Sequence, residues 1–84
     1  FGLARLRRKL LSQAEGKTLE IGAGTGLNFR HFPKDIEIVA IEPDESMRRR
    51  AVTRASRYAP SARIESAEAE SLPYADASFD TVAT

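Results

Sequence analysis

The chain has 84 residues, of which 30% are charged, and its formal net charge is +1. A net charge this small provides no global field that would favour a nucleic acid or an anionic membrane as a partner. The chain has no cysteine, which excludes a disulfide scaffold and a thiolate metal site. It also has no apolar stretch long enough to cross a bilayer and no signal-peptide pattern, so we expect a cytoplasmic protein.

The first predicted element is an amphipathic helix that ends near Glu15 and Gly16. Leucines recur in it at helical spacing, with basic residues between them: Leu3, Leu6, Leu10 and Leu11. We expect the helix to pack by this apolar face. The alternatives are a lid over a bound cofactor and a peripheral membrane contact through the basic residues.

The remaining elements follow from short apolar runs and from the residues that interrupt them. The first of them are a buried strand at 18–21, a tight turn at 22–26 and a short helix at 27–32 that is stopped by Pro33. A central strand at 36–41 follows, and then a helix at 46–58 that is capped by Asp44 or Glu45 and closed by Pro60. The last are a weaker strand at 62–66, a loop with at most one helical turn at 67–78, and a strand at 79–84. Because the chain starts with Phe1 and stops inside a predicted strand, we expect residues 1–84 to be one incomplete domain.

A glycine-rich turn from Gly22 to Gly26 follows the first strand. A dinucleotide fingerprint needs a third glycine where Leu27 stands, and a phosphate-binding P-loop needs Lys and Ser/Thr where Leu27 and Asn28 stand. Glu20 beside the turn would also repel a pyrophosphate. S-adenosylmethionine (SAM) has no phosphate, and its ammonium and sulfonium suit a nearby acid, so the turn favours SAM.

Glu42 is a second acidic signal, at the end of the second predicted strand and about twenty residues after the turn. Sites of the α/β type place an acid there to hold both ribose hydroxyls of a nucleotide. Enzymes that use NAD share this device, so Glu42 alone leaves SAM and NAD open. Capping of the next helix is the structural alternative, but Asp44 and Glu45 already suit that position.

A third signal is the segment at 66–80, SAEAESLPYADASFD. It resembles the stretch after the third strand in class I SAM-dependent methyltransferases of the ubiquinone/menaquinone-biosynthesis type, which reads glycine-aspartate-alanine-glutamate, leucine-proline-phenylalanine and then serine-phenylalanine-aspartate. With residues 19–26 and 41–47, the resemblance covers nearly the whole chain after the first helix. Residues 27–33 resemble a subgroup of small-molecule or lipid-associated thiol methyltransferases.

The resemblance implies a set of cofactor-binding positions. The turn would approach the methionine moiety with Glu20 nearby, Glu42 would hold the ribose, the 43–47 segment would line the adenine, and Glu68 would accept from the adenine amino group, with the amide of Ala69 facing the ring. Glu68 is longer than the usual aspartate, and Ala67 replaces the usual glycine. The predicted site residues are Glu20, Gly22, Ala23, Gly24, Gly26, Glu42, Pro43, Met47, Glu68 and Ala69.

The resemblance also implies the fold. We expect an α/β domain with a doubly wound parallel sheet of the class I methyltransferase (Rossmann-like) type, truncated after the fourth strand, in the strand order three, two, one, four. The first three helices would share one face of the sheet. Because the family covers the other face with later helices, we expect bare apolar strand surface, a bare fourth-strand edge and a tendency to aggregate.

The implied function is methyl transfer from SAM to a small-molecule or lipid-like nucleophile. A non-catalytic methyltransferase-like subunit and, less favoured, a nucleotide-dependent oxidoreductase are the alternatives. No catalytic residue can be named, and His31 lacks metal-ligating neighbours at ligand spacing. The run at 48–50 is interpreted as a solvated helix face, with no nucleic acid expected, and a solvated loop competes with cofactor roles for Glu68 and Glu70.

Overall fold

Four parallel strands form a single sheet in the order β3-β2-β1-β4 in the computed structural model, which describes residues 2–75 and 78–84. The order confirms the predicted α/β class and strand arrangement. The elements are α1 (Gly2–Leu11), β1 (Lys17–Ile21), the 3-10 turn η1 (Phe29–His31), β2 (Glu37–Ile41), α2 (Glu45–Tyr58), β3 (Arg63–Glu65), the 3-10 turn η2 (Ala69–Ser71) and β4 (Thr81–Ala83). Residues 76–77 of the predicted loop lie outside the described residues.

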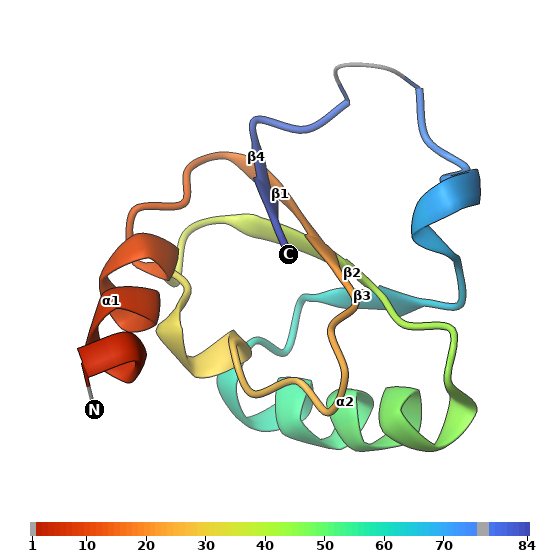
Figure 1. Ribbon diagram of the computed structural model, residues 1–84, viewed down its shortest axis with the longest axis horizontal. Helices are drawn as coiled ribbons and strands as arrows, with labels where there is room; N and C mark the ends of the chain where they lie inside the picture. The colour runs from red at the N-terminus through yellow and green to blue at the C-terminus, as the bar shows by residue number, and fades with distance from the viewer. Residues whose placement is uncertain (1, 76–77) are drawn as a thin grey trace.

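The core lies where β2 meets α2. Ala40 of β2 and Ala51 of α2 are both fully buried, and Phe29 packs into the same cluster. Small side chains at the contact let the helix approach the sheet closely. Leu11 and Ala14 join this cluster, so α1, η1 and α2 share one side of the sheet as expected (Figure 1).

The opposite side of the sheet is contacted by described residues of the segment between β3 and β4, which lies on the side away from α2 in Figure 1. Leu19, Val39 and Ile41 are buried there, and Tyr74 and Phe79 pack against them with their rings edge to face, 5.2 Å apart. The prediction of bare strand surface is therefore wrong for β1 and β2. The two aromatic side chains take the place that we assigned to later helices.

Tyr74 is anchored at its polar end as well. Its hydroxyl donates to the carboxylate of Glu65, the last residue of β3. Burial and this hydrogen bond raise the pKa of Tyr74 to about 12, so the phenol stays protonated and keeps donating at physiological pH. The bond holds the covering segment to the end of β3.

The flank formed by α1 and β4 is much less covered. Leu3 is 82% exposed, Leu6 and Leu10 are also exposed, and Val82 of β4 is 56% exposed. Only Leu11 of the predicted apolar face is buried, so the expected packing of the first helix is largely wrong. Within the described part of the chain β4 pairs with β1 alone, which confirms the open fourth-strand edge.

Two predicted helices are shorter in the structure. The first ends at Leu11 rather than near Glu15, because the chain then tightens into i→i−3 bonds and turns at Gly16, whose φ is +63°. The second is only the η1 turn, because Phe32 precedes a proline and is extended (φ −72°, ψ 149°). By contrast, α2 matches its prediction, with the Asp44 carboxylate accepting from the amide of Met47 at 2.8 Å.

Candidate cofactor site

The carboxyl ends of β1, β2 and β3 meet at one edge of the sheet, as parallel pairing requires. Two backbone hydrogen bonds extend the pairing beyond the strands. The amide of Ala23 donates to the carbonyl of Ile41 at 2.9 Å, and the amide of Glu42 donates to the carbonyl of Glu65 at 3.0 Å. The glycine turn, the end of β2 and the start of the segment after β3 are therefore held together.

Two glycines of the turn face open space. Gly22 and Gly24 have φ values of +69° and +60°, a region that other residues rarely adopt, and a Cβ added to either would meet no atom within 4 Å. A side chain at either position would project into the space beside the turn. The backbone is therefore available to a ligand from that side.

Gly26 has a different environment, although it belongs to the same motif. It is buried, and an added Cβ would lie 2.7 Å from the ring of Phe29 and 3.2 Å from the Cα of Ala51. The absence of a side chain there lets the turn pack against η1 and α2. The structure thus places Gly26 in the core rather than beside the open space.

Glu42 connects the turn to the loop that begins α2. The residue is only 7% exposed, and its two carboxylate oxygens accept from the amides of Gly24 at 2.7 Å and Asp44 at 3.0 Å. Charge-assisted bonds of this kind are stronger than neutral ones and fix the carboxylate in place. Each oxygen can accept a second hydrogen bond, so capacity remains for hydroxyl groups of a ligand.

Glu20 lies beneath the turn and is 1% exposed. Its Oε2 accepts from the Asn28 side-chain amide at 2.5 Å, whereas Oε1 has no partner among the described residues. Burial raises the pKa of Glu20, and the hydrogen bond from Asn28 partly offsets this. A buried carboxylate oxygen without a donor is unfavourable, so the site favours a ligand that brings one.

Asn28 is a site residue that the sequence did not predict. In the sequence, Asn28 only excludes a phosphate-binding loop. Its contact with Glu20 depends on the path that the turn takes between them, and no spacing rule for strands or helices connects these two positions. Its side chain is part-buried, which suits a residue that orients a buried acid.

Two hollows open on either side of Gly22. The hollow beside β2 has a volume of about 390 Å³ and is lined by Ile21, Gly22, Ile41, Glu42, Pro43, Ala67, Glu68, Ala69 and Glu70. The hollow beside the turn has a volume of about 380 Å³ and is lined by Arg7, Gly22, Ala23, Gly24, Thr25, Leu27, Asn28, Met47 and Thr84. Except for Glu20 and Gly26, every predicted site residue lines one of the two.

The β2-side hollow is acidic. Three glutamates, Glu42, Glu68 and Glu70, line it, and no lysine or arginine is among its lining residues. Glu68 and Ala69 are exposed at the start of η2, where the side chain of Glu68 makes no capping bond. A pyrophosphate would be repelled there, whereas a neutral nucleoside with hydroxyl and amino donors would be accepted.

The described ranges hold no group of three His, Asp or Glu side chains close enough to bind a metal ion. No helix within these ranges is long and apolar enough to span a bilayer. These two findings add no further site to the edge of the sheet.

Comparisons with known proteins agree with this geometry. A family model described as a methyltransferase domain matches residues 18–84. Similar solved structures include the YcgJ protein from Bacillus subtilis, which is 31% identical with a TM-score of 0.76, the match covering 93% of this chain and 35% of that chain. The [4+2]-cyclase SpnF is 26% identical with a TM-score of 0.76, and the match covers 96% of this chain and 32% of that chain. The PH0226 protein from Pyrococcus horikoshii OT3 is 27% identical with a TM-score of 0.74, and the match covers 95% of this chain and 35% of that chain. The chain spans about a third of the length of these structures. No curated protein matches it.

Proposed function

Because the chain belongs to the methyltransferase-domain family, we propose that it forms the SAM-binding, N-terminal half of a methyltransferase domain. The whole protein would transfer a methyl group to a small-molecule or lipid-like nucleophile. We further propose that it is of the ubiquinone/menaquinone-biosynthesis type, on the three motifs described above. The 84 residues alone would bind the cofactor without completing an acceptor pocket.

The single observation that carries this proposal is the acidic character of the β2-side hollow, next to the buried acid beneath the glycine turn. Glu42 borders a hollow that has no basic lining residue, and Glu20 keeps one oxygen without a donor beneath the turn. These features disfavour a diphosphate and suit a cationic, phosphate-free nucleoside. SAM has this combination of groups.

Each part of the site would bind a different part of the cofactor. Glu42 would accept from the ribose hydroxyls, and Pro43 with the amide of Ala69 would contact the adenine, whose amino group Glu68 would meet. The backbone of Gly22 and Gly24 would face the methionine end.

The turn-side hollow would receive that end of the cofactor. Ala23 and Met47 line it together with Asn28, and Glu20 would supply a buried negative charge opposite the ammonium. Charge-assisted contacts of this kind contribute roughly 1.5–3 kcal/mol each before desolvation.

The chemistry itself is an in-line displacement. When bound, SAM supplies an electrophilic methyl group on a sulfonium, which the acceptor atom attacks. The residues of this chain would contribute alignment of the donor and exclusion of water from one side. We assign no catalytic base, because the position of the acceptor is not fixed by the residues that the structure describes.

A second candidate is a methyltransferase-like domain that does not transfer a methyl group. The observation that favours it is the similarity to a chain named as a [4+2]-cyclase, which indicates that this architecture is not tied to one reaction. A dinucleotide-dependent oxidoreductase is less favoured, because Leu27 interrupts the glycine spacing and the β2-side hollow is acidic.

Calorimetric titration of the full-length protein with SAM and, separately, with NADH tests the proposal. We expect SAM to bind and NADH to give no heat of binding. Turnover is then assayed with SAM labelled in its methyl group over a panel of thiol, hydroxyl and carbon acceptors. Binding of NADH alone would refute the SAM assignment, and SAM binding without turnover would favour the second candidate.

A further inference from the structure

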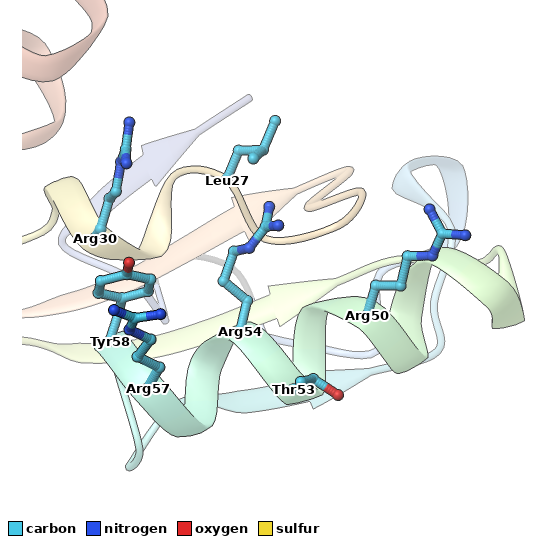
Figure 2. Close-up of a pocket in the computed structure, with 7 residues that line it drawn as sticks. All are labelled: Leu27, Arg30, Arg50, Thr53, Arg54, Arg57 and Tyr58. Atoms are coloured by element: carbon cyan, nitrogen blue, oxygen red, sulfur yellow. The ribbon is translucent and has the colours of Figure 1, made fainter.

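A further hollow lies between α2 and the η1 turn, next to the cofactor site but outside it. Its volume is about 510 Å³, within the range of small-molecule sites. The lining residues, which we call the arginine groove, are Leu27, Arg30, Arg50, Thr53, Arg54, Arg57 and Tyr58. Figure 2 shows Arg50, Arg54 and Arg57 along one side of α2, with Arg30 on the η1 turn above them.

The four arginines come from two elements that the fold brings together. Arg50, Arg54 and Arg57 stand at i, i+4 and i+7 of α2, which places them in one row on the helix surface. Like charges at this spacing destabilise a helix by a few tenths of a kcal/mol per pair. Arg30 adds a fourth positive charge from η1. The arrangement therefore costs stability unless an anion compensates for it.

No such anion is supplied by the described residues. None of the four arginines is in a salt bridge there, and no acidic side chain lines the groove. Arg54 makes only a long hydrogen bond to the hydroxyl of Thr25, at 3.5 Å. Arg49, on another side of the same helix, does pair with Glu45 at 3.4 Å. The lack of pairing is thus a property of the groove and not of α2 as a whole.

The groove also has a phenolic hydroxyl and lies near further positive charge. Tyr58 lines it, and the guanidinium of Arg57 lies over the ring of Tyr58, 5.3 Å from its centroid (Figure 2). Thr53 lines it as well, but its hydroxyl donates to the carbonyl of Arg49 at 3.3 Å. Burial lowers the pKa of His31, next to Arg30 in the chain, and the charges of Arg30, Arg8 and Arg7 lower it further. Positive charge from α1 and η1 therefore accumulates near His31.

We propose that the arginine groove is a binding site for a phosphorylated small molecule, separate from the cofactor site. Guanidinium groups bind phosphate oxygens in pairs of parallel hydrogen bonds, and several together suit a ligand with more than one negative charge. The concave shape favours a compact ligand over an extended strand of nucleic acid. Tyr58 is the only aromatic side chain in the lining, too few for base stacking along a strand.

The groove adjoins the cofactor site. Leu27 lines both the arginine groove and the turn-side hollow, and Thr25, which accepts from Arg54, lines that hollow too. A ligand in the groove would therefore contact the same loop that forms one wall of the turn-side hollow. The inference goes beyond the proposed function and does not depend on it.

The test uses inorganic pyrophosphate as the probe and the full-length protein, with binding followed by calorimetry at two salt concentrations. We expect binding that weakens as salt rises. Arg54→Gln and, from the other element, Arg30→Gln should each weaken binding about tenfold or more. Arg49→Gln is the matched control, since Arg49 lies on α2 but outside the groove. It should leave the affinity unchanged.

Further arms identify the source of the phosphate. The same dependence on Arg54 with vesicles that contain phosphatidic acid would indicate a lipid headgroup, whereas binding of pyrophosphate alone would indicate a soluble ligand. Pyrophosphate should also raise the pKa of His31, the single histidine of the chain, in a proton NMR titration. Equal losses in Arg49→Gln and Arg54→Gln, no binding of either probe, or tighter binding of single-stranded RNA would overturn the proposal.

Discussion

The centre of the sheet and its α1–β4 flank differ sharply in how far they are covered. In the centre, β1 and β2 are buried on both sides, by α2 and η1 on one and by Tyr74 and Phe79 on the other. On the flank, three of the leucines of α1 and Val82 of β4 remain exposed. The candidate cofactor site is built on the centre, so the part of the chain that would bind SAM is also the part that is structurally most complete.

The largest expected difference between the two regions is in how much a substitution lowers the free energy of unfolding. Phe29 is fully buried against Gly26 and the α2 cluster, so Phe29→Ala should lower the free energy of unfolding by about 3–5 kcal/mol. Leu3→Ala on the exposed flank is the matched control and should change it by less than about 0.5 kcal/mol. Urea denaturation followed by circular dichroism measures both. Similar losses in the two variants would show that the contrast between the regions is wrong.

The next largest expected effect is a loss of SAM affinity, which tests whether the centre of the sheet binds the cofactor. Glu42→Ala removes the acceptor that we propose for the ribose, together with the acceptor for the amides of Gly24 and Asp44. SAM affinity should fall by about 2–3 kcal/mol, a factor of tens to hundreds. Glu70→Ala alters an exposed acid on the rim of the same hollow and should have little effect. Calorimetry on the full-length protein gives both affinities. An unchanged affinity in Glu42→Ala would refute the ribose assignment.

Local signals explain what could be predicted. Asp44 before a helical pattern predicted the start of α2, and the continuous apolar run at 36–41 predicted the central strand. The parallel direction of the strands follows from the crossover segments that connect each strand to the next. Residue types and spacing predicted the glycine turn, Glu20 and Glu42, and the resemblance added Glu68 and Ala69. The structure brings most of these positions to one edge because parallel strands end on the same side.

What could not be predicted depends on contacts between segments distant in space. The covering of the sheet by Tyr74 and Phe79 arises from how a long loop folds back, and the pairing of Asn28 with Glu20 arises from the path of the turn. The sequence analysis assigned the run at 48–50, which includes Arg50, to a solvated helix face and made no prediction for the other arginines of the groove. Only the structure shows that Arg30 from another element stands across from the row on α2.

A smaller, pH-dependent effect is expected at Glu20 in the ligand-free protein. Burial raises the pKa of Glu20 in the folded state above its unfolded value, so between the two values the folded state binds more protons. The contribution of Glu20 to stability is therefore present below the unfolded pKa and is lost as the pH rises through the folded pKa.

Glu20→Gln should remove this dependence, because the amide stays neutral and can still accept from Asn28. At pH 7 the variant should unfold at a higher urea concentration than the parent, and near pH 4 the difference should shrink. Asp35→Asn, at an exposed position, serves as the control. A variant that is less stable than the parent at pH 7 would show that the buried acid is compensated within the fold.

The smallest effect on stability is expected at the flank, where Leu6→Ser with Leu10→Ser replaces two exposed leucines on α1. Neither side chain belongs to the buried core, so the free energy of unfolding of the 84-residue chain should change by less than about 1 kcal/mol. Their apolar surface and the open edge of β4 should nevertheless promote self-association, since exposed apolar patches and unpaired strand edges pair with other chains. Sedimentation velocity should therefore show less self-association in the double variant than in the parent. If the parent chain instead unfolds cooperatively and stays strictly monomeric, the exposed flank does not promote self-association. The flank and the centre would then differ only in how many of their side chains are buried.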